Sequence, residues 1–368
     1  MTRPCGGSAA RLAGLALCAF FVSCEQAPRR RLDAIDPGVY GLCEAAVGQA
    51  AWQEARLFLE RGDDPRALPL LRACIDACPD FVRAHLAYQD CARRLGGADE
   101  AAMVGYYMAL PERPSPVAAY TKARLADTSY AQCNALDAIL KRDSSFAWAH
   151  LSRGRVTRLQ GRLLPALDMF AAAIVNDPNL HEAKLERAQV LNELGRFPEA
   201  AKDYRDYLAA RPDDLPAVRE FVHLLLYRLG RVDEAQAWLE RLESAEPRAV
   251  AVRMDRAAAF WRAGRLQEAA ELYLAVLAEV EGTPRAAFNL GLLYYEVAPT
   301  DEVSRRRFWP AARAAFQWFL RGPVPVDGHE QFERTLGVPY RLARIAELLG
   351  PAVDRPVTLA DLAWPGSG

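Results

Sequence analysis

The stretch AWAHLSRGRVTRLQGRLLPALDMFAAAIVNDPNL (residues 147–180) is followed directly by HEAKLERAQVLNELGRFPEAAKDYRDYLAARPDD (181–214), and the two parts share one pattern. Four positions match at one constant spacing: Gly161 with Gly195, Ala166 with Ala200, Phe170 with Tyr204, and Pro178 with Pro212. Apolar residues recur at helical intervals on both sides of each glycine. Glycine readily ends a helix because it adopts positive φ, and proline cannot continue one. Each part therefore predicts two helices, and the fixed period predicts an array of stacked helical hairpins.

The same period divides most of the chain into hairpins. Their predicted limits are about 48–81, 82–114, 115–146, 147–180, 181–215, 216–249, 250–283 and 284–321. Three residues are missing near 111–116, one is added, most simply in Asp213–Leu215, and about nine are added near 298–307. After Gly322 the pattern stops. Within 322–368, Tyr340–Leu349 predicts an amphipathic helix that caps the array, because terminal repeats need a solvent-tolerant cover, and 351–368 predicts an extended tail.

The pattern in residues 48–321 resembles the tetratricopeptide repeat (TPR) family. Small residues stand where two helices approach closely, as at Gly154 and Ala188, and large ones fill the space between hairpins, as at Phe170. The resemblance implies an all-α fold, a right-handed α-solenoid of about eight TPR-like hairpins plus the C-terminal capping helix. There are departures from the family pattern. Arg153, Arg187 and Arg256 precede the small residue where leucine is commoner, and His223 replaces the small residue in the sixth hairpin.

In this family, the first helix of each hairpin lines a concave groove that binds extended peptides or partner helices. Arginine and aromatic residues suit such a surface because they offer large contact areas and bidentate hydrogen bonds. Ten positions are candidate groove residues by their phase: Arg155, Arg158, Gln189, Asn192, Tyr227, Arg228, Trp261, Arg262, Asn289 and Tyr295. The lysine and asparagine clamp of the chaperone-binding members is not found. The favoured function is a scaffold that binds other proteins or peptides; the alternative is a structural assembly or spacer subunit of an envelope complex without a peptide-binding groove.

Residues 1–24, MTRPCGGSAARLAGLALCAFFVSC, read as an export signal. Arg3 and Arg11 precede the apolar run Leu12–Val22, which is too short to span a membrane as a helix. The end of the run, residues 21–24, resembles the bacterial lipobox. That resemblance implies cleavage of 1–23, acylation of Cys24 and a tether over 24–47, in a chain anchored to the inner or outer membrane and facing the periplasm. A plain secretory signal, with Cys24 incidental, and a cytosolic chain with an apolar start are the alternatives.

The rest of the chain offers little catalytic chemistry. Its 46 Lys and Arg against 47 Asp and Glu argue against nucleic acid as a partner. The five histidines lie far apart, and no phosphate-binding loop or nucleophile motif occurs. No enzyme activity, metal or cofactor is expected. The cysteines that would remain after lipidation are Cys43, Cys74, Cys78, Cys91 and Cys133. A bridge between Cys78 and Cys91 and a set of buried free thiols both remain open.

Overall fold

The computed structural model describes Tyr40 and residues 43–111, 115–279, 283–297, 301–322, 337–352 and 356–365. The contacts divide it into two units, Met1–Ala183 and Lys184–Gly368. All regular elements in the described ranges are helices, which confirms the predicted all-α class of stacked helix pairs. No described helix is both long and apolar enough to cross a membrane. The predicted signal segment, Cys24 and most of the tether lie outside the described residues.

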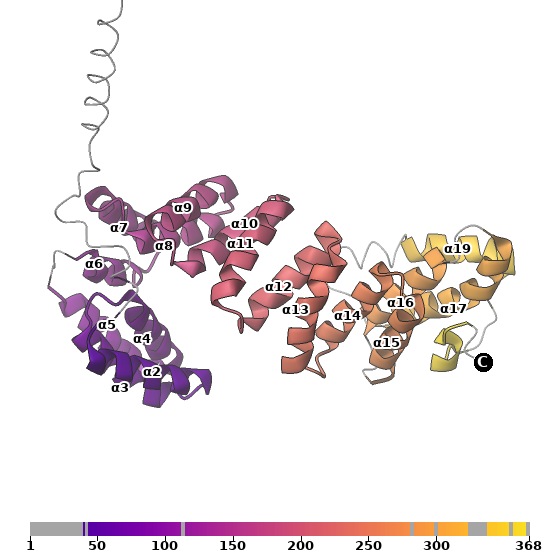
Figure 1. Cartoon of the computed structure of the whole chain (residues 1–368), viewed down its shortest axis with the longest axis horizontal. Helices are drawn as coiled ribbons and strands as arrows, with labels where there is room; N and C mark the ends of the chain where they lie inside the picture. Colours follow the sequence, from indigo (N-terminus) through magenta and orange to yellow (C-terminus); the bar gives the residue numbers. More distant parts are fainter. Residues whose placement is uncertain are drawn as a thin grey trace, which may run out of the picture. The chain divides into compact units, whose positions relative to one another are not determined.

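Helices of the first unit follow one another as pairs (Figure 1). They are α2 (Ala46–Glu60), α3 (Asp64–Ala77), α4 (Val82–Leu95), α5 (Gly97–Ala109), α6 (Pro116–Ala123), α7 (Ser129–Arg142), α8 (Ala147–Leu159) and α9 (Leu163–Asn176). Helix α6 has eight residues and is shorter than the other α-helices of this unit. It belongs to the hairpin whose repeat period is three residues short near 111–116. Side-chain caps mark several starts: Asp63 accepts from the Arg66 amide at α3, and Thr128 accepts from the Ala131 amide at α7.

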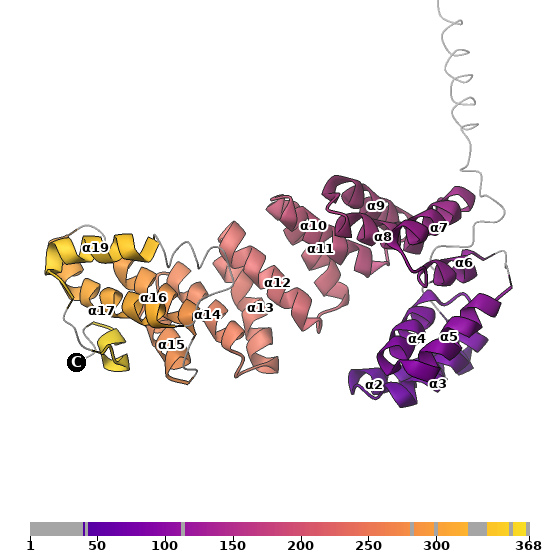
Figure 2. The same ribbon diagram turned by 180° about the vertical axis from the view of Figure 1, so that it is seen from behind.

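Helices of the second unit repeat this arrangement (Figure 2). Helix α10 (His181–Glu193) begins just before the unit boundary. It is followed by α11 (Phe197–Ala210), α12 (Leu215–His223) with the π-helix η2 (Leu224–Leu229), α13 (Val232–Ala245), α14 (Val250–Arg262), α15 (Leu266–Glu279), α16 (Pro284–Val297), α17 (Glu302–Arg321), α19 (Val338–Leu349) and the 3₁₀ turn η4 (Leu359–Leu362).

The insertion near 298–307 lengthens a helix. Helix α17 has 20 residues, against 14 in α15. Asp301 caps its start by accepting from the Ser304 amide. The aromatic ring of Phe316 packs against Gly291, just as the ring of Phe170 packs against Gly154. More residues lie between Gly291 and Phe316 than between Gly154 and Phe170. The extra residues therefore extend the start of α17 and leave the helix-to-helix contact unchanged.

The C-terminal end of the second unit is packed. Val338 and Ile345 of α19 are fully buried in the cluster that α15, α16 and α17 form. Residues 359–365 were predicted to be part of an extended tail, and this was wrong. The Tyr294 hydroxyl donates to the Leu362 carbonyl at 2.8 Å, and the Trp364 ring contacts the rings of Tyr294 and Phe308. This apolar contact covers the end of the hairpin stack, which no further hairpin covers in the described part of the chain.

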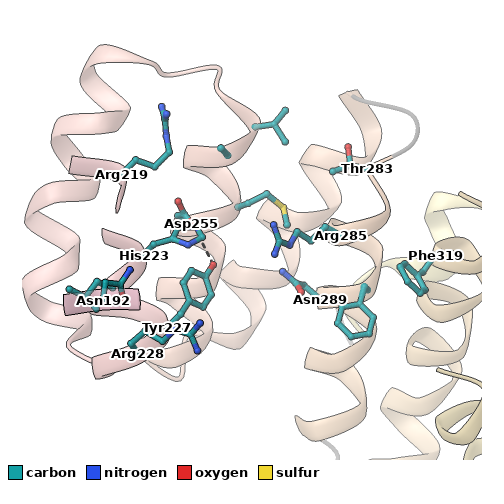
Figure 3. A pocket seen from close by; sticks show the side chains of 15 residues that line it. Asn192, Arg219, His223, Tyr227, Arg228, Asp255, Thr283, Arg285, Asn289 and Phe319 are labelled. Carbon is teal, nitrogen blue, oxygen red and sulfur yellow. Dashed lines mark hydrogen bonds and ion pairs between the residues drawn. The ribbon is translucent and has the colours of Figure 1, made fainter. Parts of the chain in front are cut away.

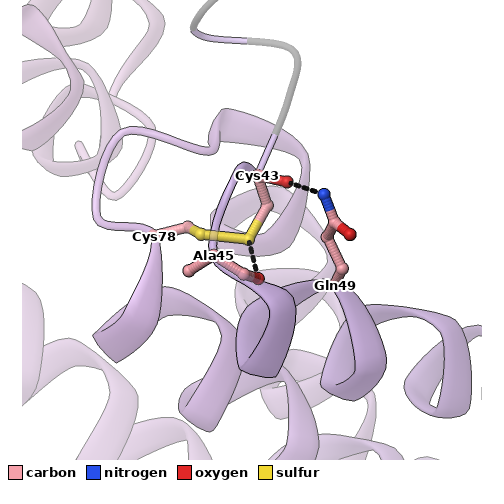
Figure 4. Close-up of a disulfide and its surroundings, with 4 residues drawn as sticks. All are labelled: Cys43, Ala45, Gln49 and Cys78. Carbon is pink, nitrogen blue, oxygen red and sulfur yellow. Dashed lines mark hydrogen bonds between the residues drawn. A yellow bond between two sulfur atoms is a disulfide. The ribbon is translucent and has the colours of Figure 1, made fainter.

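The disulfide of the first unit joins Cys43 to Cys78, with 5.5 Å between their Cα atoms (Figure 4). Of the two alternatives left open for the cysteines, a bridge from Cys78 to Cys91 is not formed, because Cys78 lies at the end of α3 whereas Cys91, on α4, lies beside the start of α3. Cys78 is the C-cap of α3, whereas the Cys91 thiol donates to the carbonyl of Asp64 at the first residue of α3. Cys74, Cys91 and Cys133 are buried free thiols, and burial raises the pKa of Cys91 to about 12.

Loss of this disulfide is expected to lower the free energy of unfolding by about 2–4 kcal/mol, because the bond links two cysteines with a sequence separation of 35 and so closes a loop in the unfolded chain. Urea unfolding of the wild type and of Cys43→Ser, each with and without dithiothreitol, measures the effect. Dithiothreitol should destabilise the wild type and leave Cys43→Ser unchanged. An equal response of both proteins to the reductant would contradict the assignment.

Candidate functional site

The first helix of the sixth hairpin contains one extra residue. Helix α12 begins at Leu215, one repeat period after the first residue of α10, but Gly230 follows Gly195 by one residue more than a period. The addition therefore lies between 215 and 230, where η2 (Leu224–Leu229) has π-helical hydrogen bonding. The predicted place of the addition, Asp213–Leu215, was wrong. A π-turn absorbs one residue without ending the helix, and such turns are frequent at functional sites.

This shift corrects the expectation for His223. Counted from the helix start, Val222 stands in the buried position of Ala188, and it is fully buried. The side chain of His223 is 52% exposed and turns toward α14. After the shift, Leu224, Leu225 and Leu226 are buried, and Tyr227 and Arg228 are exposed. The added residue thus places three polar side chains on the surface beside α14.

Asp255 of α14 lies at the centre of this surface (Figure 3). It is only 3% exposed. The Tyr227 hydroxyl donates to Asp255 Oδ1 at 3.2 Å, and His223 Nε2 lies 3.2 Å from the same oxygen. Burial of its hydroxyl and the charge of Asp255 raise the pKa of Tyr227, so the hydroxyl stays protonated and donates. Asp255, Tyr227 and His223 therefore form one polar cluster, which is the polar floor of the site.

Two adjoining hollows open over this floor, one of about 840 Å³ and one of about 500 Å³. Tyr227 and Asn289 line both, so the hollows form one groove, called here the α12–α16 groove. The larger hollow is lined by Asn192, Arg219, His223, Leu224, Tyr227, Arg228, Val250, Ala251, Met254, Asp255, Thr283, Arg285, Phe288, Asn289 and Phe319. The smaller one adds Gly230, Val232, Ala258, Trp261, Arg262, Tyr273 and Glu296. The first helices of successive hairpins supply most of these residues.

The charged lining of the α12–α16 groove is mainly basic: four arginines line it, against the carboxylates Asp255 and Glu296. Arg219 is paired with Glu246 at 2.6 Å. Arg228 and Arg262 have no carboxylate partner among the described residues. Each of these guanidinium groups lies 5.6 Å from an aromatic ring, that of Phe197 for Arg228 and that of Tyr227 for Arg262. Both side chains are exposed and available to an anionic ligand.

Six of the ten candidate residues line this groove: Asn192, Tyr227, Arg228, Trp261, Arg262 and Asn289. The other four do not. The ring of Tyr295 is stacked on that of Trp309, with centroids 5.3 Å apart, and belongs to the packing between α16 and α17. Gln189 donates to Glu220 at 2.9 Å outside the two hollows. Arg155 and Arg158 lie on α8 in the first unit.

The sequence reasoning missed His223, Asp255 and Arg285 as groove residues. The signal for Asp255 was available, because Asp255 precedes Asn289 by one repeat period and so occupies the same repeat position. His223 was assigned to a packing position because the added residue was placed before the helix. Within the ranges that the structure covers, no three His, Cys, Asp or Glu side chains are grouped so that they could hold a metal ion.

Comparison with known families identifies the repeat. The tetratricopeptide repeat model matches residues 160–214 and 224–284. These residues are TPR repeats. The chain that carries these TPR repeats is 32% identical over 98 residues to the DnaJ homolog subfamily C member 3 of Mus musculus and 31% identical to that of Homo sapiens. Each match covers 27% of this chain and 19% of the relative, so the chain spans about a fifth of the length of these relatives.

Solved structures with similar helix pairs include two other TPR proteins. YrrB, a TPR protein described as having an unusual peptide-binding site, is 15% identical with a TM-score of 0.40, and the match covers 59% of this chain and 93% of YrrB. A tetratricopeptide repeat protein from Parabacteroides merdae is 16% identical with a TM-score of 0.38, and the match covers 80% of this chain and all of that one.

Proposed function

We propose that this TPR protein is a membrane-anchored scaffold of the cell envelope that binds other proteins through the α12–α16 groove. The observation that carries the proposal is the pair of exposed arginines, Arg228 beside the Phe197 ring and Arg262 beside the Tyr227 ring, both without carboxylate partners in the described part of the chain. Such side chains form charge-assisted, often bidentate hydrogen bonds to a ligand. The hydrogen bond from the Tyr227 hydroxyl to the buried Asp255 holds the ring in place.

The envelope location is supported by two independent features. Residues 1–24 read as a lipoprotein signal that ends in Cys24. The disulfide between Cys43 and Cys78 suits an oxidising compartment such as the bacterial periplasm, because disulfides are rare in the reducing cytosol. Stable anchoring requires more than one acyl chain, which the acylated cysteine of the lipoprotein family supplies.

Replacing Cys24 with serine is expected to release the protein from membranes, because Cys24 is the only residue proposed to carry lipid. Fractionation after a high-salt wash, followed by immunoblotting, measures the release. Cys18→Ser, within the segment proposed to be cleaved, is the matched control and should leave the protein in the membrane fraction. A Cys24→Ser protein that remains in the washed membranes would refute the anchor.

The groove is tested by the double variant Arg228→Glu, Arg262→Glu. Trp261 is left in place because it packs against the buried cluster of the second unit. We expect crosslinking in native membranes, read by mass spectrometry, to lose the partners that the wild type captures. Arg241→Glu is the matched control: Arg241 lies on α13, stacks on Trp238 at 5.8 Å and lies outside the groove lining. An unchanged set of partners in the double variant, with native circular dichroism, would favour a spacer role instead.

A further inference from the structure

We infer that the α12–α16 groove selects an extended protein segment that carries two acidic side chains separated by two residues, one for Arg228 and one for Arg262. This inference rests on the proposed function and assigns the chemistry of the partner. Arg228 precedes Gly230 by two positions, and Arg262 precedes Gly264 by two. The two arginines therefore occupy equivalent positions in successive hairpins, Arg228 in the larger hollow of the groove and Arg262 in the smaller one.

The spacing of the two hairpins sets the spacing of the ligand's carboxylates. Arg262 lies 5.6 Å from the ring of Tyr227, the residue that precedes Arg228, so one short segment can reach both arginines. A polyproline II segment rises about 3.1 Å per residue with about three residues per turn, so its residues i and i+3 lie on one face about 9 Å apart. Two acidic side chains with two residues between them therefore face the groove together and present one carboxylate to each hairpin. Adjacent acidic residues point to different faces of such a segment, so only one of them meets a guanidinium group of this pair.

The polar residues around the arginines suit the ligand's backbone. Asn192 of α10 and Asn289 of α16 lie on helices that flank those of the two arginines. Their amides both donate and accept hydrogen bonds, as an extended backbone requires. The carboxylate of Asp255 is engaged at its Oδ1 atom by Tyr227 and His223. The arginines therefore dominate what the groove presents to an anion, and the Tyr227 ring beside Arg262 offers an apolar contact.

Fluorescence anisotropy with defined probes tests the inference on the full purified chain. The probe is a short fluorescein-labelled peptide with an amidated C-terminus, rich in proline and alanine, that carries Glu-x-x-Glu. Comparison peptides of the same length carry Gln-x-x-Gln, Lys-x-x-Lys or two adjacent glutamates. We expect Glu-x-x-Glu to bind at least about 10-fold more tightly than the glutamine and lysine peptides and more tightly than the adjacent pair, and to weaken at high salt.

Variants assign the binding to the two arginines. Arg228→Ala and Arg262→Ala should each weaken Glu-x-x-Glu about 10-fold, whereas Arg241→Ala should leave it unchanged. Equal affinity for the acidic and glutamine peptides, equal affinity for the two glutamate spacings, or binding that both arginine variants retain would overturn the inference. If the acidic peptides do not bind but the capture of crosslinked partners still depends on Arg228 and Arg262, the groove is the binding site and its ligand has other chemistry. If neither peptide binding nor partner capture depends on these arginines, the proposed function is also wrong.

Discussion

Replacing Arg187 with methionine is expected to lower the free energy of unfolding by about 3–5 kcal/mol, because the change leaves a buried carboxylate without its counter-charge. Arg187 on α10 forms two hydrogen bonds to Asp203 on α11, from Nε to Oδ2 at 2.6 Å and from Nη2 to Oδ1 at 2.7 Å. The side chain of Asp203 is only 2% exposed. The hydrogen bonds to Asp203 raise the pKa of Arg187, so its guanidinium group stays protonated. Urea unfolding followed by circular dichroism in the far ultraviolet measures the loss.

Two further variants distinguish the loss of this ion pair from general damage to the helix. The double variant Arg187→Met, Asp203→Leu removes both charges and should regain most of the lost stability, because apolar residues of similar size replace a buried ion pair at little cost. Arg196→Met removes a pair with Glu199 that is exposed on both sides, and no loss should be resolved. A double variant no more stable than Arg187→Met would show that the cost does not come from the unpaired Asp203.

The fold of this protein could be predicted because one short pattern recurs at a nearly constant period. The closing glycines, the small residues and the aromatic residues that pack on them each have one role, repeated along the chain. The arginines that depart from the family pattern fit the same helix pairs. Arg153 pairs with Asp137 at 2.8 Å and Arg256 with Glu243 at 2.8 Å, so each extends to a carboxylate on a neighbouring helix. Their partners could not be read from the sequence because several acidic residues lie within reach.

The site was predictable only in part, because a change of period does not reveal where a residue was added. Spacing located the addition between Gly195 and Gly230 but could not distinguish a longer loop from a π-turn. That choice decides whether His223 packs inside or faces the groove. The disulfide was missed for a similar reason. Cys43 precedes the first predicted hairpin, and only the folded chain brings it to Cys78.

Replacing Phe170 with alanine is expected to cost about 3–5 kcal/mol of stability, because this fully buried ring fills the space between α8 and α9. The ring lies directly against Gly154, where an added Cβ would stand 2.5 Å from Phe170 Cε1. Gly154→Ala alone must therefore displace the ring, at a cost of about 1–3 kcal/mol. This cost is offset by a gain in stability of up to about 1 kcal/mol, because alanine favours a helix more than glycine does.

The two changes together give the sharper test. In the Phe170→Ala protein the ring atoms nearest to the new methyl group of Gly154→Ala are gone, so the clash is relieved and the helix preference of alanine should dominate. We therefore expect Gly154→Ala to destabilise the wild type and to stabilise the Phe170→Ala variant, measured by urea unfolding as a double-mutant cycle. Gly105→Ala is the control, because an added Cβ at Gly105 meets nothing within 4 Å. Its change in the free energy of unfolding should have the same sign in both backgrounds. If Gly154→Ala also keeps its sign, the close approach of α8 to Phe170 does not determine which residue this position accepts.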